Sequence, residues 1–337
     1  MMNNRDYWFK RAQQHDKEVY KAVADLEKEL KKLYSEALDE IMKDFESYAQ
    51  RYGMNYKSLW KEASKLDQKG FKKYVAENAE KLRMNSLASE EMVDKFFPAY
   101  DPARVNRNAL IYKQLSMRIA PLAYAFEETL TKLLENIYVS TLLRNKYDFA
   151  KEFNVSSPFY KFDEKKINEL MTYKWSGENF STRIWANTDD LRYVLQQEFV
   201  KATIKGESIP KLAKTVSQRM SSSYQDAVRL VNTEAAYFDN KASIDSYAEC
   251  KLDKYEFLAT LDSRTSHVCQ VLDGKVFYVK DAVPGVNYPP MHVRCRSTTI
   301  PYFEDDDEER IARDSNGKNM IVDGNMTYKE YEKLFLG

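Results

Sequence analysis

The sequence predicts a mainly α-helical fold, in which a long helical N-terminal region precedes a second helical segment and a small α+β C-terminal domain. Gly and Pro number nine each among 337 residues, and no Pro occurs before Pro98. This scarcity favours long uninterrupted helices, because these two residue types are the ones that break them. Strand-like patterns begin only near Lys254. We therefore expect three parts, formed by residues 1–150, 151–303 and 304–337.

One long helix is predicted from residue 5 to about residue 50, where Gly53 would end it. Its apolar side chains recur in steps of three and four, which places them on one stripe. They are Val19, Ala22, Val23, Leu26, Leu30, Leu33, Ala37, Ile41 and Phe45. At about 1.5 Å per residue this helix would be roughly 60 Å or more long. Such a length favours a coiled-coil arm or interaction stalk, with an ordinary helical bundle as the alternative.

Further helices are expected along the first three quarters of the chain. Asp101 followed by Pro102 is a helix start signal, and Pro121 should kink or split that helix. The turn-rich segment after Glu152 would suit a domain boundary. The remaining helical segments are Ser58 to Leu82 with an interruption at Gly70, Asp189 to Lys205, Ser208 to Val216, and a last one from about Ser223 to Cys250. Within the last segment, Arg229 and Glu234 are expected on a solvated face or in an ion pair between helices.

A small sheet is predicted after this helical region. The candidate strands are Tyr255 to Ala259, Lys275 to Val279 after a turn at Asp273-Gly274, and Cys295 to Tyr302. The acidic run from Glu304 to Glu309 is expected to be a solvated linker. Thr327 and Glu330 have the spacing of a capping box, so a short terminal helix should follow, with Tyr331, Leu334 and Phe335 able to dock.

Composition removes several classes of protein. The 52 basic and 52 acidic residues give a net charge of zero, so total charge gives no support to a general nucleic-acid binder. Three cysteines are too few for a disulfide framework, which indicates a reducing compartment. The N-terminus has no apolar core of a signal peptide, and no run of about 18 apolar residues is present, so we expect no membrane contact.

Rare residue types gather between Asp262 and Ser297. This segment holds two of the three cysteines, Cys269 and Cys295, and two of the three histidines, His267 and His292. Clusters of His and Cys at short spacing are typical of metal sites, nucleophiles and covalent cross-links. The segment is therefore the candidate functional site.

The order of short motifs resembles the phage Mu F-like minor head protein family. The order is RIW, then G-x-S, RLVNTE, DSRT-x3-C-x2-LDG-x2-F and PP-x-H-x2-CRS, between about Trp175 and Tyr302. The opening RDYWFKR before a long helix also resembles minor capsid proteins of phages that infect Gram-positive bacteria. Each motif alone is weak evidence, and their order is what makes the resemblance specific.

The resemblance implies a minor head protein of a tailed phage, which acts in head assembly and in genome packaging or delivery. Its expected partners are the portal protein and capsid or scaffolding proteins, with packaged DNA as a further contact. Its expected location is the virion, at the head interior or portal vertex, and the host cytoplasm during assembly. Some relatives carry a further C-terminal toxin or ADP-ribosyltransferase module, and we expect no room for one because Gly337 follows the last motif closely.

The resemblance also implies a structural zinc site, with one departure. Family members often have a Cys three residues before the position of Cys269, where this chain has Ser266. Cys269, His292 and Cys295 remain as candidate zinc ligands, and His267 is the nearby replacement for the fourth. If residues 267–269 formed a strand, His267 and Cys269 would point to the same face. The alternatives are a metal-free Cys pair beside a hydrogen-bonded His, or a disulfide between Cys269 and Cys295.

Catalysis is the less favoured interpretation, so no catalytic residue is assigned. A metal-dependent nuclease or other hydrolase would need His267 and His292 in an open pocket with a carboxylate, and the expected helix after His292 is absent. A nucleophilic Cys269 would need an oxyanion site that the sequence does not reveal. We instead expect Asp262, Arg264 and Thr265 to be structural, with Asp262 capping a turn and Arg264 pairing with Asp262 or Asp273. A DNA-binding packaging factor remains the third possibility, and it predicts a one-sided basic surface.

Overall fold

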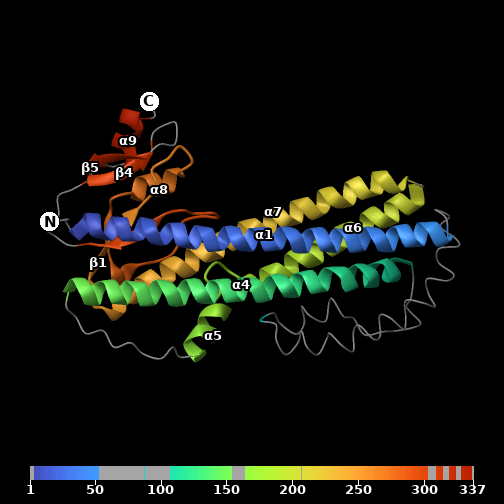
Figure 1. Ribbon diagram of the computed structural model, residues 1–337, viewed down its shortest axis with the longest axis horizontal. Coiled ribbons are helices and arrows are strands. Elements are labelled where there is room, and N and C mark those ends of the chain that lie inside the picture. Colours follow the sequence, from blue (N-terminus) through green and yellow to red (C-terminus); the bar gives the residue numbers. More distant parts are fainter. Residues whose placement is uncertain are drawn as a thin grey trace. The chain divides into compact units, whose positions relative to one another are not determined.

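The computed structural model describes residues 4–52, 87, 107–153, 164–205, 207–302, 309–313, 319–323 and 328–335. Helices dominate these residues, and a small sheet lies near the C-terminal end, which confirms the predicted fold class (Figure 1). The helices are α1 (Asn4–Tyr52), α4 (Arg107–Phe153), α5 (Glu164–Thr172), α6 (Phe180–Lys205), α7 (Ile209–Glu249), α8 (His267–Leu272) and α9 (Tyr328–Phe335). The strands are β1 (Lys254–Leu258), β2 (Val276–Tyr278), β3 (Thr298–Pro301), β4 (Glu309–Arg313) and β5 (Asn319–Asp323).

The long helices form where the apolar stripes predicted them. Helix α1 has 49 residues, and Val23, Leu26, Leu30, Ala37 and Ile41 of its predicted stripe are buried. A split at Pro121 was expected, but α4 continues through this residue as one helix. The residues on both sides of Pro121 are buried, so tertiary packing holds the helix together despite the backbone hydrogen bond that a proline loses.

Two helix boundaries differ from the prediction. The structure has one helix, α7, where two were predicted with a gap after Val216. That gap contains three serines, which have weak helix propensity, but no Gly or Pro. The packing of Val216, Met220 and Ala227 overrides the weak propensity of the serines. Helix α6 begins at Phe180, nine residues earlier than predicted, because the Asn179 carboxamide accepts a hydrogen bond from the Thr182 backbone N–H (2.8 Å).

Several predicted features lie outside the described residues. They are the helix from Ser58 to Leu82, the helix start at Asp101-Pro102, the acidic residues 304–308, and Thr327 of the capping box. The terminal helix itself is present as α9, in which Leu334 is exposed.

The described chain divides into two compact units, each built from separated segments. One unit contains residues 1–25, 132–167 and 229–337, and the other contains residues 26–131 and 168–228. Helices α1, α4 and α7 therefore contribute to both units. The sequence predicts that the chain divides into separately folding parts after residues 150 and 303. These two boundaries remain predictions.

The second unit, residues 26–131 with 168–228, contains a buried carboxylate on α4. The side chain of Glu127 accepts hydrogen bonds from the Ser181 hydroxyl (2.6 Å), the Trp185 indole N–H (2.9 Å) and the Leu87 backbone N–H (2.7 Å). Both Ser181 and Trp185 lie on α6 and are fully buried. The Trp of the RIW motif is therefore a structural residue that connects α6 to α4.

The first unit contains the antiparallel sheet, in the order β2-β1-β3. Tyr255 of the central strand pairs with Phe277 of β2 and with Pro301 of β3. The three predicted strands are thus confirmed, with Thr298 as the first residue of the last one. The core beneath the sheet includes Trp8 and Phe9 from the first turns of α1.

A buried ion pair joins the start of α1 to this sheet. The Arg5 guanidinium donates to both carboxylate oxygens of Glu256 in β1, at 3.0 and 2.5 Å. Both side chains are less than a tenth exposed. The first half of α1, up to Asp25, is therefore part of the same compact unit as the C-terminal sheet.

An additional hairpin, β4–β5, lies in the segment that was expected to be only a linker before the terminal helix. Its first strand reads ERIAR, in which charged residues surround two apolar ones. This segment is short and charged. It therefore lacks the alternating apolar and polar pattern by which a strand is recognised in a sequence.

Candidate metal centre and the adjoining pocket

Three of the four predicted zinc ligands meet in one place. Cys269 lies on α8, and His292 and Cys295 lie at the two ends of a tight turn before β3. Within the turn, the Cys295 N–H donates to the His292 carbonyl (3.1 Å), and Arg294 has a positive φ of 58°. The Arg294 N–H also donates to the hydroxyl of Thr233 on α7 (3.1 Å). The turn is therefore held against α7, the helix that carries the RLVNTE motif.

Two separations between these ligand atoms are close to those that a tetrahedral zinc ion requires, and all three atoms lie within 4.8 Å of one another. The Cys269 Sγ lies 3.8 Å from the Cys295 Sγ and 3.4 Å from the His292 Nε2. Bond lengths of about 2.3 Å to sulfur and about 2.05 Å to nitrogen give expected separations of about 3.8 and 3.6 Å in a tetrahedron. The residues present fit a Cys2His zinc site with one position left for a fourth ligand.

The imidazole of His292 has the tautomer that metal ligation needs. Its Nδ1 lies 2.9 Å from the Val293 carbonyl oxygen, which can only accept, so Nδ1 carries the proton. The Nε2 atom is then an acceptor, and it faces the Cys269 Sγ and the Ser266 hydroxyl, which lies 2.7 Å away. A backbone carbonyl that holds the second nitrogen is common around histidines that bind metals.

The two thiols are electrostatically different. The hydrogen bond between them stabilises the Cys295 thiolate and lowers the pKa of Cys295, with backbone N–H groups of Met291 and Ser297 also contributing. The same hydrogen bond, together with burial, raises the pKa of Cys269. Metal ligands bind as thiolates, so the lowered pKa of Cys295 is compatible with its role as a ligand.

The expected fourth residue, His267, is not among the three whose ligand atoms converge. The same-face argument assumed a strand, whereas His267 begins helix α8 and is exposed. Residues two positions apart on a helix do not face each other. Ser266, one residue earlier, is the residue whose side chain reaches His292.

The predicted structural residues surround this centre. The Asp262 carboxylate accepts the Arg264 N–H (2.9 Å), as a turn cap would. Its stronger partner is Arg296, which donates at 2.5 and 2.8 Å and was missed by sequence reasoning. Partial burial opposes ionisation of Asp262, but the hydrogen bonds and charge of Arg296 outweigh it and lower its pKa to about 2. The exposed Arg264 guanidinium lies farther away, at 3.6 Å.

The remaining predicted residues also have structural positions. The Thr265 hydroxyl donates to the Thr260 carbonyl. Gly274 adopts a φ of 72° and donates its N–H to the Phe257 carbonyl (2.9 Å), so a turn with positive φ explains the glycine. On α7, Arg229 is exposed and Glu234 is buried, so the two charges do not share one environment.

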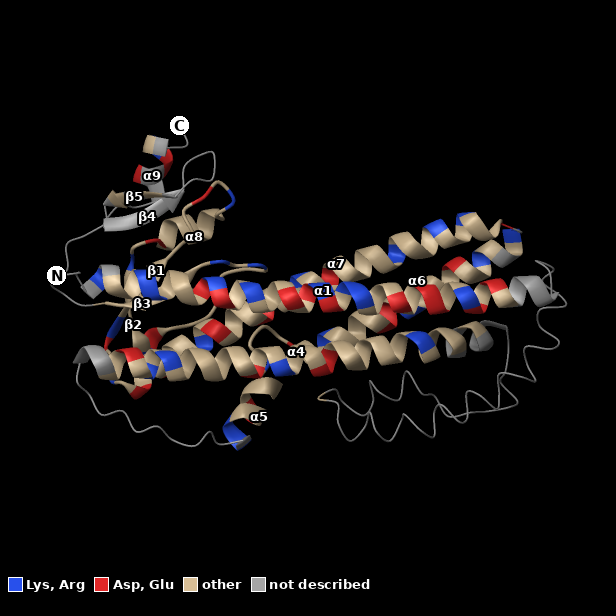
Figure 2. Cartoon of the chain, in the orientation of Figure 1, with Lys and Arg blue, Asp and Glu red and all other residues tan. Residues whose placement is uncertain are grey.

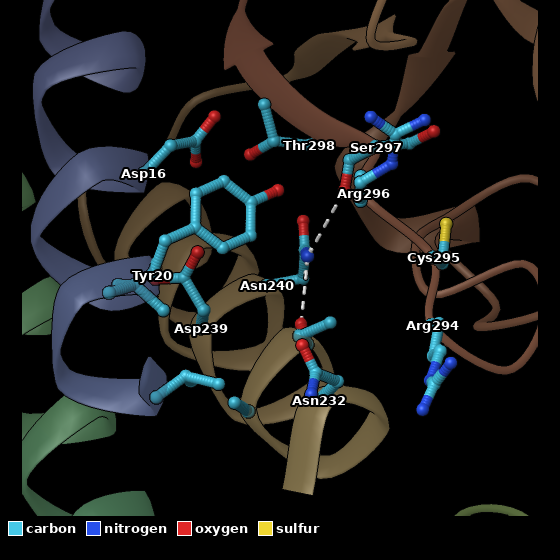
Figure 3. A pocket seen from close by; sticks show the side chains of 14 residues that line it. Asp16, Tyr20, Asn232, Asp239, Asn240, Arg294, Cys295, Arg296, Ser297 and Thr298 are labelled. Atoms are coloured by element: carbon cyan, nitrogen blue, oxygen red, sulfur yellow. Dashed lines mark hydrogen bonds between the residues drawn. The ribbon is translucent and has the colours of Figure 1, made fainter. Parts of the chain in front are cut away.

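A pocket adjoins the metal centre and was not predicted. It lies between α1, α7 and the segment 294–298, and encloses about 480 Å³ including space open to solvent (Figure 3). Asp16 and Tyr20 of α1 and Asp239 of α7 line it. Burial, followed by repulsion from Asp239, raises the pKa of Asp16 to about 7. Asp239 also contacts His15, which lies 224 positions earlier in the sequence. No local spacing could have indicated that these residues meet.

His15 and Thr141 contact one oxygen of Asp239 from outside this pocket. The His15 Nε2 lies 2.6 Å from the Asp239 Oδ1, and the Thr141 hydroxyl donates to the same oxygen (2.8 Å). Burial opposes protonation of His15, but the charge and hydrogen bond of Asp239 outweigh it and raise the pKa of His15. Arg144 of α4 lies 2.8 Å from the other imidazole nitrogen. Helices α1, α4 and α7 thus share one polar network.

Comparison with known proteins supports one family. Residues 194–300 match the family described as Phage Mu protein F like protein. A 203-residue stretch is 24% identical to NAD(+)--arginine ADP-ribosyltransferase EFV of Enterococcus faecalis (strain ATCC 700802 / V583), and covers 56% of this chain. That stretch represents 40% of the Enterococcus protein, so the chain spans less than half of the relative's length. No solved structure matches the chain.

The family match covers the ordered motifs that follow RIW, which itself lies before the matched residues. It includes RLVNTE on α7, the α8 segment with Cys269, and the turn with His292 and Cys295. Through residues 194–300, the chain is therefore similar to the Phage Mu protein F like protein family.

Proposed function

We propose that the chain acts as a phage minor head protein that associates with the portal vertex and the procapsid during head assembly and genome packaging or delivery. The observation that carries this proposal is the Mu F-like match over residues 194–300. The long helices α1, α4 and α7 offer extended surfaces for contacts with portal, capsid or scaffolding subunits. The protein would be found in the virion and, during assembly, in the host cytoplasm. None of the described helices is long and apolar enough to cross a membrane.

The proposed role is structural rather than enzymatic. The Enterococcus relative is named as an ADP-ribosyltransferase, but the chain spans only 40% of that protein. The nuclease alternative required two histidines and a carboxylate in one pocket. Among the described residues, the converging group of three metal-ligating side chains is Cys269, His292 and Cys295, and it contains no carboxylate. The arrangement that the nuclease alternative required is therefore not found at this centre.

The DNA-binding alternative receives little support from charge. Lys and Arg alternate with Asp and Glu along both α1 and α4, so neither helix presents one sign of charge alone (Figure 2). A protein that neutralises many phosphates usually carries a one-sided basic surface. We therefore place protein–protein contacts ahead of contacts with packaged DNA.

A structural zinc ion at Cys269, His292 and Cys295 is part of the proposal. Bound zinc would fix α8 against the turn before β3, and so stabilise the sheet that residues 254–301 form. The support is the spacing of the three ligand atoms and the carbonyl that orients His292. Protein purified without chelator should contain about one zinc per chain. Content far below one equivalent, or a Cys269–Cys295 disulfide in the purified protein, would remove this part.

Co-purification with the portal protein tests the function. Tagged full-length chain should retain the portal oligomer of its own phage from co-expressing cells at low salt, and should not retain a portal from an unrelated phage. An NAD⁺-dependent arginine modification assay on the same preparation should show no transfer. Failure to retain the portal would contradict the proposed association, and efficient transfer would contradict the structural role.

A further inference from the structure

The pocket between α1, α7 and residues 294–298 contains a buried amide oxygen without a partner. Asn240 is 2% exposed, and its Nδ2 donates to the Ala236 carbonyl (2.8 Å) and the Ser297 carbonyl (3.5 Å). Carbonyl oxygens only accept, so these bonds fix which amide atom is nitrogen. The Oδ1 atom has no hydrogen-bond partner and faces the pocket between Tyr20 and Arg296 (Figure 3). A buried acceptor without a hydrogen-bond partner requires an explanation, and a bound ligand is one.

Two carboxylates line the same pocket. Both hydrogen bonds to Asp239 reach its Oδ1, which leaves Oδ2 available. Among the described residues, no hydrogen bond or ion pair reaches the carboxylate of Asp16. Asp16 and Asp239 repel each other. The pocket thus concentrates carboxyl oxygen atoms whose hydrogen-bonding and coordinating capacity the protein itself does not fully use.

The basic residues at the rim do not supply the missing charge. Arg296 donates two hydrogen bonds to Asp262, on the side away from Asp16. The Arg294 side chain extends away from Asp16 and Asp239 (Figure 3), and it is exposed. His15 offsets the charge of Asp239 from outside the pocket, at Oδ1. The rim arginines therefore do not pair with Asp16 or Asp239.

We propose that this pocket binds one divalent cation of the oxygen-seeking kind, Mg²⁺ or Ca²⁺, through Asp16, Asp239 and the amide oxygen of Asn240. Carboxylate and amide oxygens are the ligands that these ions prefer, and Mg²⁺ commonly keeps several waters beside one or two carboxylates. Water molecules would complete the coordination within the open pocket. The site differs from the thiol-rich centre nearby, which selects softer metals. The cation would join α1 to α7 and to the segment that carries Cys295.

Calorimetric titration of the full-length protein with MgCl₂ and with CaCl₂ tests the proposal. We expect one saturable site per chain for at least one ion, with a dissociation constant of about 1 mM or below. Asp16→Asn should weaken binding at least about tenfold, because it removes a ligand charge. Asp39→Asn is the matched control, since it makes the same change at an exposed position of α1 and should leave binding unchanged. Zinc content measured before and after titration should stay constant.

Two outcomes would overturn the proposal. One is the absence of saturable binding of either ion up to about 10 mM in protein whose helical circular dichroism is intact. The other is equal binding by the wild-type protein and Asp16→Asn, which would place the ion elsewhere. Asn240→Leu gives a second check, because it removes the amide oxygen without changing the charge. It should weaken binding in folded protein while the wild type and Asp39→Asn bind alike, and undiminished binding would remove Asn240 from the site.

Discussion

Asp262 and Arg296 form a two-point ion pair, with nitrogen–oxygen distances of 2.5 and 2.8 Å, that joins the segment after β1 to the segment before β3. Arg296 directly follows Cys295 in sequence, and Asp262 lies four residues before Ser266. It therefore connects the two halves of the candidate metal centre without using either thiol. Bidentate pairs between Arg and a carboxylate are among the stronger charged contacts in proteins.

This pair predicts a pH-dependent contribution to stability. The pKa of Asp262 is lowered to about 2 in the folded protein, below the value of about 3.9 for an unfolded Asp. Its stabilising effect is therefore fully present above about pH 4 and is lost as the pH falls towards 2. Urea unfolding of the wild type and Asp262→Asn from pH 7 to pH 3 should show a difference that shrinks with acidification. The exposed Asp253→Asn should change stability by less than about 0.5 kcal/mol. A difference for Asp262→Asn that grows towards low pH would contradict the pairing.

The Arg5–Glu256 pair should make the first turn of α1 necessary for the stability of the sheet. Arg5→Leu would leave the buried Glu256 carboxylate without this partner, at a cost of about 3–5 kcal/mol. The double variant Arg5→Leu/Glu256→Leu should recover much of that loss, because no uncompensated charge remains. Denaturant unfolding of the single and double variants measures the coupling. Lys32→Ala, which breaks an exposed pair with Glu36, should have little effect. Equal losses for Arg5→Leu and Lys32→Ala would count against the buried pair.

The indole of Trp185 should contribute through its N–H as well as through its volume. Trp185→Phe removes the donor to Glu127, which leaves a buried carboxylate oxygen with one bond fewer. We expect a loss of about 1–3 kcal/mol in the free energy of unfolding, beyond the effect of the smaller ring. Tyr193→Phe on the same helix removes the hydroxyl of an exposed aromatic residue and serves as the control. If Trp185→Phe costs as much stability in a Glu127→Leu background as in the wild type, the hydrogen bond to Glu127 is not the cause.

The position of Ser266 predicts a gain in metal affinity. Its hydroxyl lies 2.7 Å from the His292 Nε2, and a thiol there would complete a Cys-x2-Cys pair with Cys269. Ser266→Cys should bind zinc at least about tenfold more tightly than the wild type in competition with a chromophoric chelator. Ser263→Cys adds a thiol at an exposed position of the same segment and should leave affinity unchanged. An unchanged affinity in Ser266→Cys would show that residue 266 does not face the ion.

Local patterns in the sequence predicted the elements and some of the site. The stripe of Val23, Leu26 and Leu30 identified the buried face of α1, and the spacing of His292 and Cys295 identified the turn of the candidate metal centre. Local patterns did not predict which distant residues meet. Arg296 pairs with Asp262 across 34 positions, and Asp239 meets His15 across 224. One sequence contains no signal for such pairings, because they depend on how the long helices pack.

The predictions of helix boundaries were wrong at two places. A cap formed by Asn179 starts α6 nine residues early, and buried contacts carry α4 through Pro121. The cap is a local signal that was overlooked, whereas at Pro121 tertiary packing overrides local propensity. His267 was assigned to the metal site on the assumption of a strand, and the helix α8 turned that side chain away.

The composition of assembling heads tests the central claim most directly. Particles made by co-expressing capsid, scaffold and this chain, with and without the portal protein, are separated by sedimentation and analysed by quantitative mass spectrometry. The proposed role predicts that the chain sediments with portal-containing particles in a fixed ratio to the portal, and is depleted from particles without it. Recovery of the chain only at the top of the gradient, or equally in both kinds of particle, would contradict association with the portal vertex.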